Sequence, residues 1–172
     1  MAFLGIKRKI TSFCVNRLFV GAKHFEKKRK LLNWAGYSIG KGTKVVGPFE
    51  CTATLRIGEN CWVGKNFIVN GNGTVTIGDN CDIAPEVIFQ TGGHEIGTHE
   101  RRAGKGIRFE SKVGNGCWIG ARSTILGGVT IQDGCVIAAC SCVVKDVESD
   151  TLVGGIPAKV IRRIDDNENT EK

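Results

Sequence analysis

The chain of 172 residues is long enough for one domain with its own core and an attached segment. It contains no run of about 18 apolar residues that would predict a transmembrane helix. Its N-terminus lacks the uninterrupted apolar stretch and the small-residue cleavage site of a signal peptide. We therefore expect a cytoplasmic protein whose eight cysteines are reduced thiols.

The net charge of +7 is concentrated at the N-terminus. Residues 1–30 contain nine Lys and Arg and one acid, Glu26, a local charge of +8, so the remainder carries −1. Apolar residues recur near helical spacing in this segment: Phe3, Ile6, Ile10, Phe13 and Val20. These features predict a basic amphipathic helical arm over residues 1–36 that covers the open end of the fold. Its charge fits a solvated helix and an anionic partner, such as a membrane surface, equally well.

An aliphatic or other apolar residue then recurs every six positions. The first series is Ile39, Val45, Cys51, Ile57, Val63 and Val69, and after a two-residue slip it continues with Ile77, Ile83 and Phe89. The second series is Ile107, Val113, Ile119, Ile125, Ile131, Ile137 and Val143. This period predicts a solenoid in which each such residue points inward and stacks on its copy in the next coil. Small side chains stand four positions later, and four of them are cysteines expected to serve as packing residues: Cys61, Cys81, Cys117 and Cys135.

The six-residue period fails in one place. Between Phe89 and Ile107, the six-step positions hold Glu95 and Arg101 instead of aliphatic residues. The segment of about 92–106 is therefore expected to leave the solenoid as a loop. Two of the three histidines of the chain lie in it. Excursions of this kind commonly carry functional residues.

The repeat resembles that of the hexapeptide-repeat acyltransferases over about residues 37–163. The stretches "CWIGARSTILGGVTIQDGCVIAACSCVVKDV" and "GGIPAKVIRRI" resemble the C-terminal block of that family. The resemblance implies a mainly β fold, a left-handed parallel β-helix shaped as a triangular prism, assembled as a homotrimer with active sites between subunits. It also implies an acetyltransferase that uses acetyl-CoA as acyl donor and requires no metal. Residues 164–172 are interpreted as a solvated polar tail.

The resemblance also implies an acceptor side of the site. His94, in "TGGHEIG", matches the family's catalytic histidine, the general base of a one-step ternary-complex reaction. Glu95 is a candidate to orient it. Arg101 and Arg102 either bind a phosphate or carboxylate of the acceptor or form a solvated charge cluster. Asn70 matches an asparagine near the acceptor, although "NGNGT" lacks the acidic residue that the family often has next.

The donor side follows from the same resemblance. Trp118 resembles the aromatic residue that walls the acyl site near the histidine of a neighbouring subunit. The backbone N–H of Ala121 matches a donor to the thioester carbonyl, where negative charge develops. Ala139 lies where the pantetheine arm runs. Three basic residues match positions that meet the coenzyme A phosphates: Lys145, Lys159 and Arg162.

Several functions remain open on the sequence. The first choice of acceptor is a hydroxyl or amine of a sugar in a polysaccharide or its nucleotide-sugar precursor. A lipid-linked precursor would place the basic arm at the inner face of the membrane. Serine is second and an antibiotic third, and no nucleic-acid partner is expected. A carbonic anhydrase shares the prism, but His94 and His99 supply only two zinc ligands. A non-catalytic scaffold would need neither His94 nor Trp118.

Overall fold

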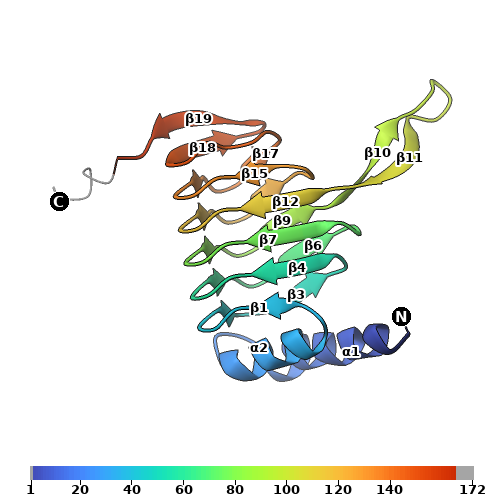
Figure 1. The fold of residues 1–172 in the computed structure, drawn as a ribbon, viewed down its shortest axis with the longest axis vertical. Helices are drawn as coiled ribbons and strands as arrows, with labels where there is room; N and C mark the ends of the chain where they lie inside the picture. The colour runs from blue at the N-terminus through green and yellow to red at the C-terminus, as the bar shows by residue number, and fades with distance from the viewer. Residues whose placement is uncertain (1, 166–172) are drawn as a thin grey trace.

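The computed structural model describes residues 2–165, which form a three-sided parallel β-helix above two N-terminal helices (Figure 1). The helices are α1 (Ala2–Phe13) and α2 (Phe25–Trp34), and a π-helical turn, η1 (Cys14–Leu18), follows α1. Successive coils place short strands on three faces, so segments far apart in sequence pair in parallel. The mainly β fold class is confirmed. Of the expected polar tail, residues 166–172 lie outside the described part.

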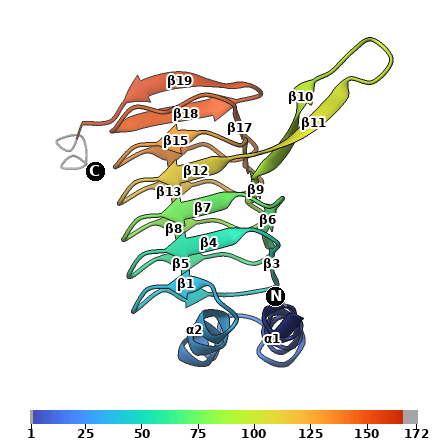
Figure 2. The ribbon, with the colours of Figure 1, turned by 45° about the vertical axis from the view of Figure 1, so that its right-hand side comes forward.

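Three sheets of parallel strands form the faces of the prism, and Figure 2 shows the strands of successive coils stacked along its axis. The first face contains β1 (Ser38–Ile39), β4 (Thr54–Ile57), β7 (Thr74–Ile77), β12 (Glu110–Val113) and β15 (Thr130–Ile131). The second contains β2 (Lys44–Val45), β5 (Trp62–Val63), β8 (Asp82–Ile83), β13 (Trp118–Ile119), β16 (Val136–Ile137), β18 (Thr151–Gly155) and the antiparallel β19 (Ala158–Arg163). The third contains β3 (Phe49–Cys51), β6 (Phe67–Asn70), β9 (Ile88–Gln90), β14 (Thr124–Ile125) and β17 (Cys142–Val143).

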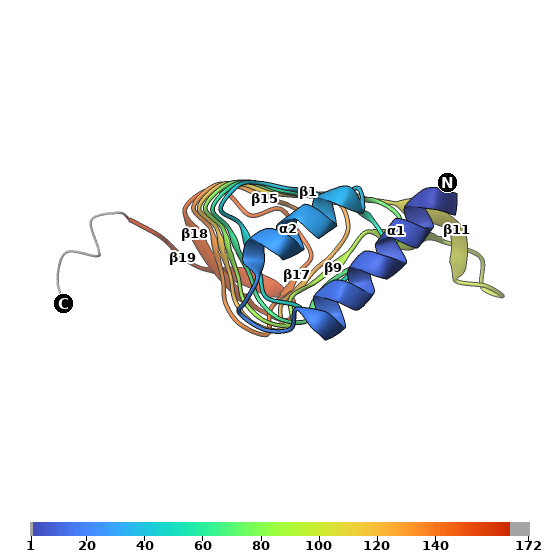
Figure 3. The ribbon, with the colours of Figure 1, turned by 90° about the horizontal axis from the view of Figure 1, so that it is seen from below.

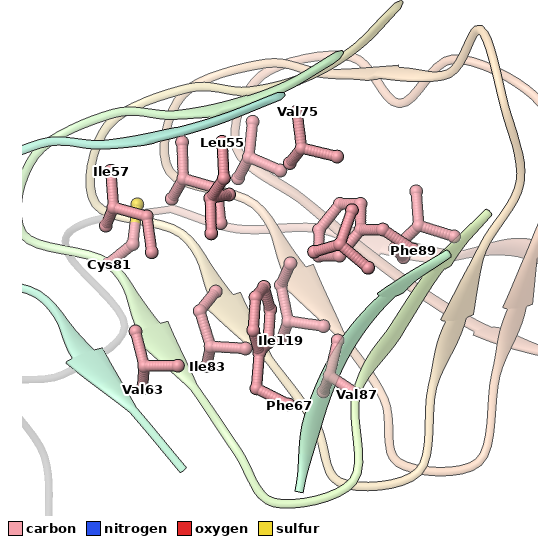
Figure 4. Packing of buried hydrophobic residues seen from close by; sticks show 14 of the residues in the cluster. Leu55, Ile57, Val63, Phe67, Val75, Cys81, Ile83, Val87, Phe89 and Ile119 are labelled. Carbon is pink, nitrogen blue, oxygen red and sulfur yellow. The ribbon is translucent and has the colours of Figure 1, made fainter. Parts of the chain in front are cut away.

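The six-step residues form the core of the prism. In register on the second face, Ile83, Ile119 and Ile137 are at most 1% exposed, and each stacks on its copy in the next coil. Figure 4 shows such side chains converging from the three faces. Side chains alternate between the two sides of a strand, so the neighbour of each core residue points outward. Two expected members differ, because Cys51 is only partly buried and Ile107 lies outside the prism.

The four cysteines at the small positions are buried, as predicted. Each is at most 2% exposed. Each thiol donates to a backbone carbonyl of the adjoining coil at 3.0–3.1 Å. Cysteine fits here because the position admits only a small side chain and supplies a weak partner for a carbonyl.

The N-terminal arm covers the first coil, which Figure 3 shows from below. The residues that cover it are not the apolar series predicted for this purpose. Phe3 is 71% exposed and Phe13 59%. The inner side of α1 and η1 is instead largely polar: Arg8 donates to the carbonyls of Thr52 and Ala53 at 3.3 Å.

Polar contacts between the arm and the first coil continue beyond α1, in η1. The side chain of Asn16 exchanges two hydrogen bonds of 2.8 and 2.9 Å with the backbone of Phe49, at the start of β3. Val15 and Leu32 are fully buried beneath the first coil. Because the polar side faces the prism, the apolar side of α1 is turned outward. Among residues 2–165, no helix is long and apolar enough to cross a membrane.

Candidate active site

The irregular segment leaves the prism as an antiparallel hairpin of β10 (Gly92–Ile96) and β11 (Ala103–Arg108), and not as the loop expected from the sequence. Figure 1 shows it projecting between β9 and β12. Pairing satisfies backbone groups that no longer have partners in neighbouring coils. Ile107 pairs with Gly93 within this hairpin, which explains why it is absent from the core.

His94 lies in β10 with an exposed side chain. Its Nδ1 is 2.9 Å from the carbonyl oxygen of Gly104, on the opposite side of the hairpin. A carbonyl can only accept, so the neutral imidazole carries its proton on Nδ1 and donates it to Gly104. Nε2 is then left with a lone pair, which is the protonation state that a general base requires.

A cavity of about 460 Å³ lies beside His94 at the base of the hairpin. Its walls are Gly71, Asn72, Gly92, Gly93, His94, Gly106, Ile107 and Arg108. The backbone carbonyl of Asn70 accepts hydrogen bonds of 2.7 and 2.8 Å from the side chain and backbone of Thr91. This tie joins the end of β6 to the base of the hairpin. The structure thus brings the Asn70 segment and His94 to the same corner, between the third and first faces.

The remaining polar residues of the hairpin are exposed. Arg102 donates to the carbonyl of Gly97 at 3.3 Å, across the hairpin tip, and Arg101 is exposed beside it. The strand register shifts between His94 and Ile96. Within residues 2–165, no hydrogen bond joins Glu95 to His94. The roles suggested for Glu95, Arg101 and Arg102 therefore stay predictions.

The residues predicted to hold the donor lie mostly on the second face and its corner with the third. Trp118 is 58% exposed in β13. Ala121 and Ala139 occupy successive coils at the corner, where the N–H of Cys140 donates to the carbonyl of Ala121 at 2.8 Å. In the described part of the chain, the N–H of Ala121 donates to no backbone carbonyl. It is available to a ligand.

An ion pair that the sequence analysis missed borders this corner. Arg122 Nε lies 2.8 Å from Glu86 Oε2, and this hydrogen bond raises the pKa of Arg122. Both residues have a positive φ, at 65° for Glu86 and 61° for Arg122. The two positions occupy equivalent turns of adjacent coils, and no local sequence pattern predicts their ion pair.

The basic residues are divided between two parts of the prism. Lys159 and Arg162 lie on β19, the last strand of the second face, whereas Lys145 follows β17 at the corner between the third and first faces. His94 projects from that same corner, away from the face that carries Trp118. A single chain therefore does not bring His94 and Trp118 to one cavity.

Comparison with known proteins places this arrangement in a family. The family description "Bacterial transferase hexapeptide (six repeats)" matches residues 110–145, and "Hexapeptide repeat of succinyl-transferase" matches residues 54–84. Galactoside O-acetyltransferase of Escherichia coli (strain K12) is 36% identical over 145 residues, covering 83% of this chain and 71% of that protein. The chain belongs to the hexapeptide-repeat acetyltransferases. It is an enzyme of the galactoside O-acetyltransferase type.

Solved structures of hexapeptide-repeat acetyltransferases share the fold. A galactoside acetyltransferase in complex with coenzyme A superposes with a TM-score of 0.81 at 32% identity, covering 95% of this chain and 84% of that one. An acetyltransferase from Vibrio cholerae O1 biovar eltor, complexed with acetyl coenzyme A, gives 0.81 at 30% identity, covering 96% and 89%. The predicted left-handed β-helix is thereby confirmed. Among residues 2–165, no three His, Cys, Asp or Glu side chains are grouped to hold a metal.

Proposed function

We propose that this hexapeptide-repeat acetyltransferase transfers the acetyl group of acetyl-CoA to a hydroxyl of a sugar, with His94 as general base. The observation that carries the proposal is the hydrogen bond between His94 Nδ1 and Gly104, because it leaves Nε2 free to take a proton. The identity to a galactoside O-acetyltransferase supports a sugar as the acceptor. The free N–H of Ala121 and the exposed Trp118 fit the thioester end of the donor.

Each of the predicted site residues has a separate role in the reaction. Acetyl-CoA supplies a thioester, whose carbonyl carbon is open to attack. His94 Nε2 accepts the proton of the sugar hydroxyl as the hydroxyl oxygen bonds to that carbon, and returns it to the departing sulfur. The N–H of Ala121 donates to the oxygen that gains negative charge. Lys145, Lys159 and Arg162 hold the phosphates by charge.

The proposal includes a homotrimer with its active sites between subunits. One chain presents His94 and Trp118 on different sides of the prism. Two chains side by side can combine the hairpin of one with the second face of the other. Enclosure between two walls also removes water, which a single convex prism cannot do.

Turnover of acetyl-CoA against a panel of acceptors tests the function. We expect release of the coenzyme thiol with methyl β-galactoside or maltose, and only background release with serine. Transfer to a hydroxyl predicts an alkali-labile ester in the product, identified by mass spectrometry. Turnover of serine alone would replace the sugar by an amino acid. A mass in solution equal to one chain would contradict the trimer.

We further propose that the arm contacts the anionic inner face of a membrane. The outward side of α1 carries Phe3, Ile6, Ile10 and Phe13, each 47–71% exposed. Lys9 and Arg17 are exposed near this strip. An amphipathic helix with apolar residues on one face and flanking cations is suited to an anionic lipid surface. Its inner side is already bound to the prism through Arg8 and Asn16.

Vesicle sedimentation tests this contact. We expect the protein to bind phosphatidylglycerol vesicles and not phosphatidylcholine vesicles. Replacing Ile6 and Ile10 by serine should weaken binding at least about tenfold, because each buried isoleucine contributes about 1.5–3 kcal/mol. Ile156→Ser, at an exposed position remote from α1, is the matched control. Unchanged binding would contradict a lipid contact through this strip. A change of oligomeric state in the double variant would show instead that the strip meets another chain.

A further inference from the structure

The second face of the prism carries a column of outward side chains from successive coils. Lys44 pairs in register with Trp62, Trp62 with Asp82, and Asp82 with Trp118. Neighbouring strands lie about 4.8 Å apart, so each tryptophan is one strand away from Asp82. The chain thus places a carboxylate between two indole rings. Figure 2 shows the three strands, β5, β8 and β13, one above another.

The side chains around Asp82 form a slot of about 410 Å³. Its walls are Trp62, Asp82, Ile83, Ala84, Pro85 and Trp118. A volume of this order is within the range of small-molecule sites in proteins. This slot is separate from the cavity beside His94, and shares no residue with it. It therefore needs its own explanation.

The two tryptophan walls of the slot, Trp62 and Trp118, differ in their packing. The ring of Phe25, in α2, packs edge-on against Trp62 with centroids 5.8 Å apart. Trp62 is partly buried by its surroundings, whereas Trp118 is 58% exposed. An exposed indole offers a large, rigid apolar surface to a ligand. The carboxylate of Asp82 is also exposed, and within residues 2–165 no hydrogen bond or ion pair engages it.

We propose that the Trp62–Asp82–Trp118 slot binds the sugar ring of the acceptor. The indoles cover the apolar C–H faces of the ring, and Asp82 accepts hydrogen bonds from two of its hydroxyl groups. This inference rests on the proposed sugar acetyltransfer, and it assigns Asp82 and Trp62 to acceptor binding. Trp118 is common to this slot and to the proposed acyl site, so a ring in the slot lies next to the acetyl group.

The chemistry of the slot also selects among sugars. A carboxylate attracts hydroxyl and ammonium donors and repels phosphate and carboxylate groups. Neutral hexosides and amino sugars therefore fit, whereas a sugar phosphate bound directly at Asp82 does not. "NGNGT", at the end of β6, supplies no acid to the acceptor. Asp82 provides the acidic group from a neighbouring face.

Acceptor kinetics of the trimeric enzyme test the assignment, with methyl β-galactoside and maltose as probes. Asp82→Asn should raise the acceptor KM at least about tenfold, because a hydrogen bond to a charged acceptor is lost, and leave the acetyl-CoA KM within about twofold. Trp62→Ala should raise the acceptor KM about fivefold. Glu110→Gln, an exposed carboxylate on the first face in the same coil as Trp118, should change neither constant.

Sugar binding is read independently from the quenching of tryptophan fluorescence. If the sugars are acetylated and neither Asp82→Asn nor Trp62→Ala alters the acceptor KM, the slot is refuted and the function stands. If the sugars quench the fluorescence saturably, but Asp82→Asn does not respond and no acetyl transfer occurs, the slot stands and the function fails. If no sugar is acetylated and no sugar quenches the fluorescence, both the slot and the proposed function are refuted. Circular dichroism confirms that the variants are folded.

Discussion

Replacement of His94 by alanine is expected to lower kcat about a thousandfold, the middle of the range for loss of a positioned general base. The hydrogen bond of Nδ1 to Gly104 orients the ring and selects the neutral tautomer with a lone pair on Nε2, and His94 is the one imidazole among the described residues that line the cavity. Coenzyme A should bind with a dissociation constant within about twofold of the wild type, because His94 is not one of its predicted contacts, most of which lie on the second face and its corner with the third. Calorimetry with coenzyme A and steady-state turnover measure the two effects.

His99 supplies the matched control for this prediction. It is an exposed histidine in the same hairpin, on the connection between β10 and β11. His99→Ala should keep kcat within about twofold of the wild type. The assignment of the base is wrong if the two variants lose activity equally, or if His94→Ala retains most of its turnover. A loss of coenzyme binding in His94→Ala would indicate a misplaced hairpin and not a missing base.

The core of the prism could be predicted from the sequence because it depends on a strictly local rule. Each coil repeats the same turn, so a residue such as Ile119 sits on Ile83 whenever the count of six is kept. The six-residue count fails to predict the core where the chain leaves the stacked coils. Ile107 continues the count, yet it pairs with Gly93 in the hairpin, because the coil resumes only at β12.

The candidate site was predictable only in part. His94 stands in a recognisable motif, but its partner is a backbone carbonyl ten residues later, which no side-chain pattern encodes. No sequence motif predicts a binding site at Asp82 and Trp62 either. Their meeting depends on the register across a 20-residue coil, which includes the two-residue slip. Sequence spacing alone does not indicate which outward side chains become neighbours.

The arm shows a different limit of sequence analysis. The spacing of its apolar residues predicts an amphipathic helix, but the spacing alone does not indicate which side of that helix faces the prism. In the structure the polar side does, because Arg8 and Asn16 satisfy backbone groups at the rim of the first coil. The net charge of the arm fits a solvated helix and an anionic partner equally well, but it does not distinguish one cation from another. One of its lysines proves to be structural.

Lys28 is fully buried in α2, beneath the first coil. Its Nζ donates to the carbonyls of Gly21 at 2.5 Å, Val45 at 3.1 Å and Val46 at 2.5 Å. An ammonium group has three donors and no acceptor, so all its hydrogen-bonding capacity is used. The contacts tie α2 to the segment before it and to β2. The ring of Phe25 lies 5.5 Å from the same Nζ.

Lys28→Met is therefore expected to lower the free energy of unfolding by about 3 kcal/mol. Methionine keeps most of the volume but leaves three carbonyls without this donor. The buried carbonyl of Val45 costs about 1–3 kcal/mol and the partly buried ones of Gly21 and Val46 cost less, offset in part by removal of a buried charge. Urea denaturation measures the loss. Lys27→Met, exposed on the same helix, should change stability by less than about 0.5 kcal/mol. Equal effects of the two substitutions would contradict the structural role.

The interactions of Lys28 and of the exposed cations of the arm are expected to depend differently on salt concentration. The interactions of exposed charges with a lipid surface weaken as ionic strength rises, because the screening length falls to about 3 Å at 1 M salt. The hydrogen bonds of Lys28 are shielded from solvent and should contribute equally at low and high salt. The stability difference between wild type and Lys28→Met should therefore persist in 1 M salt, under conditions that release the protein from anionic vesicles. The cations of the basic arm would then include two that hold the fold, Arg8 and Lys28, and exposed ones, such as Lys9 and Arg17, that can bind a partner.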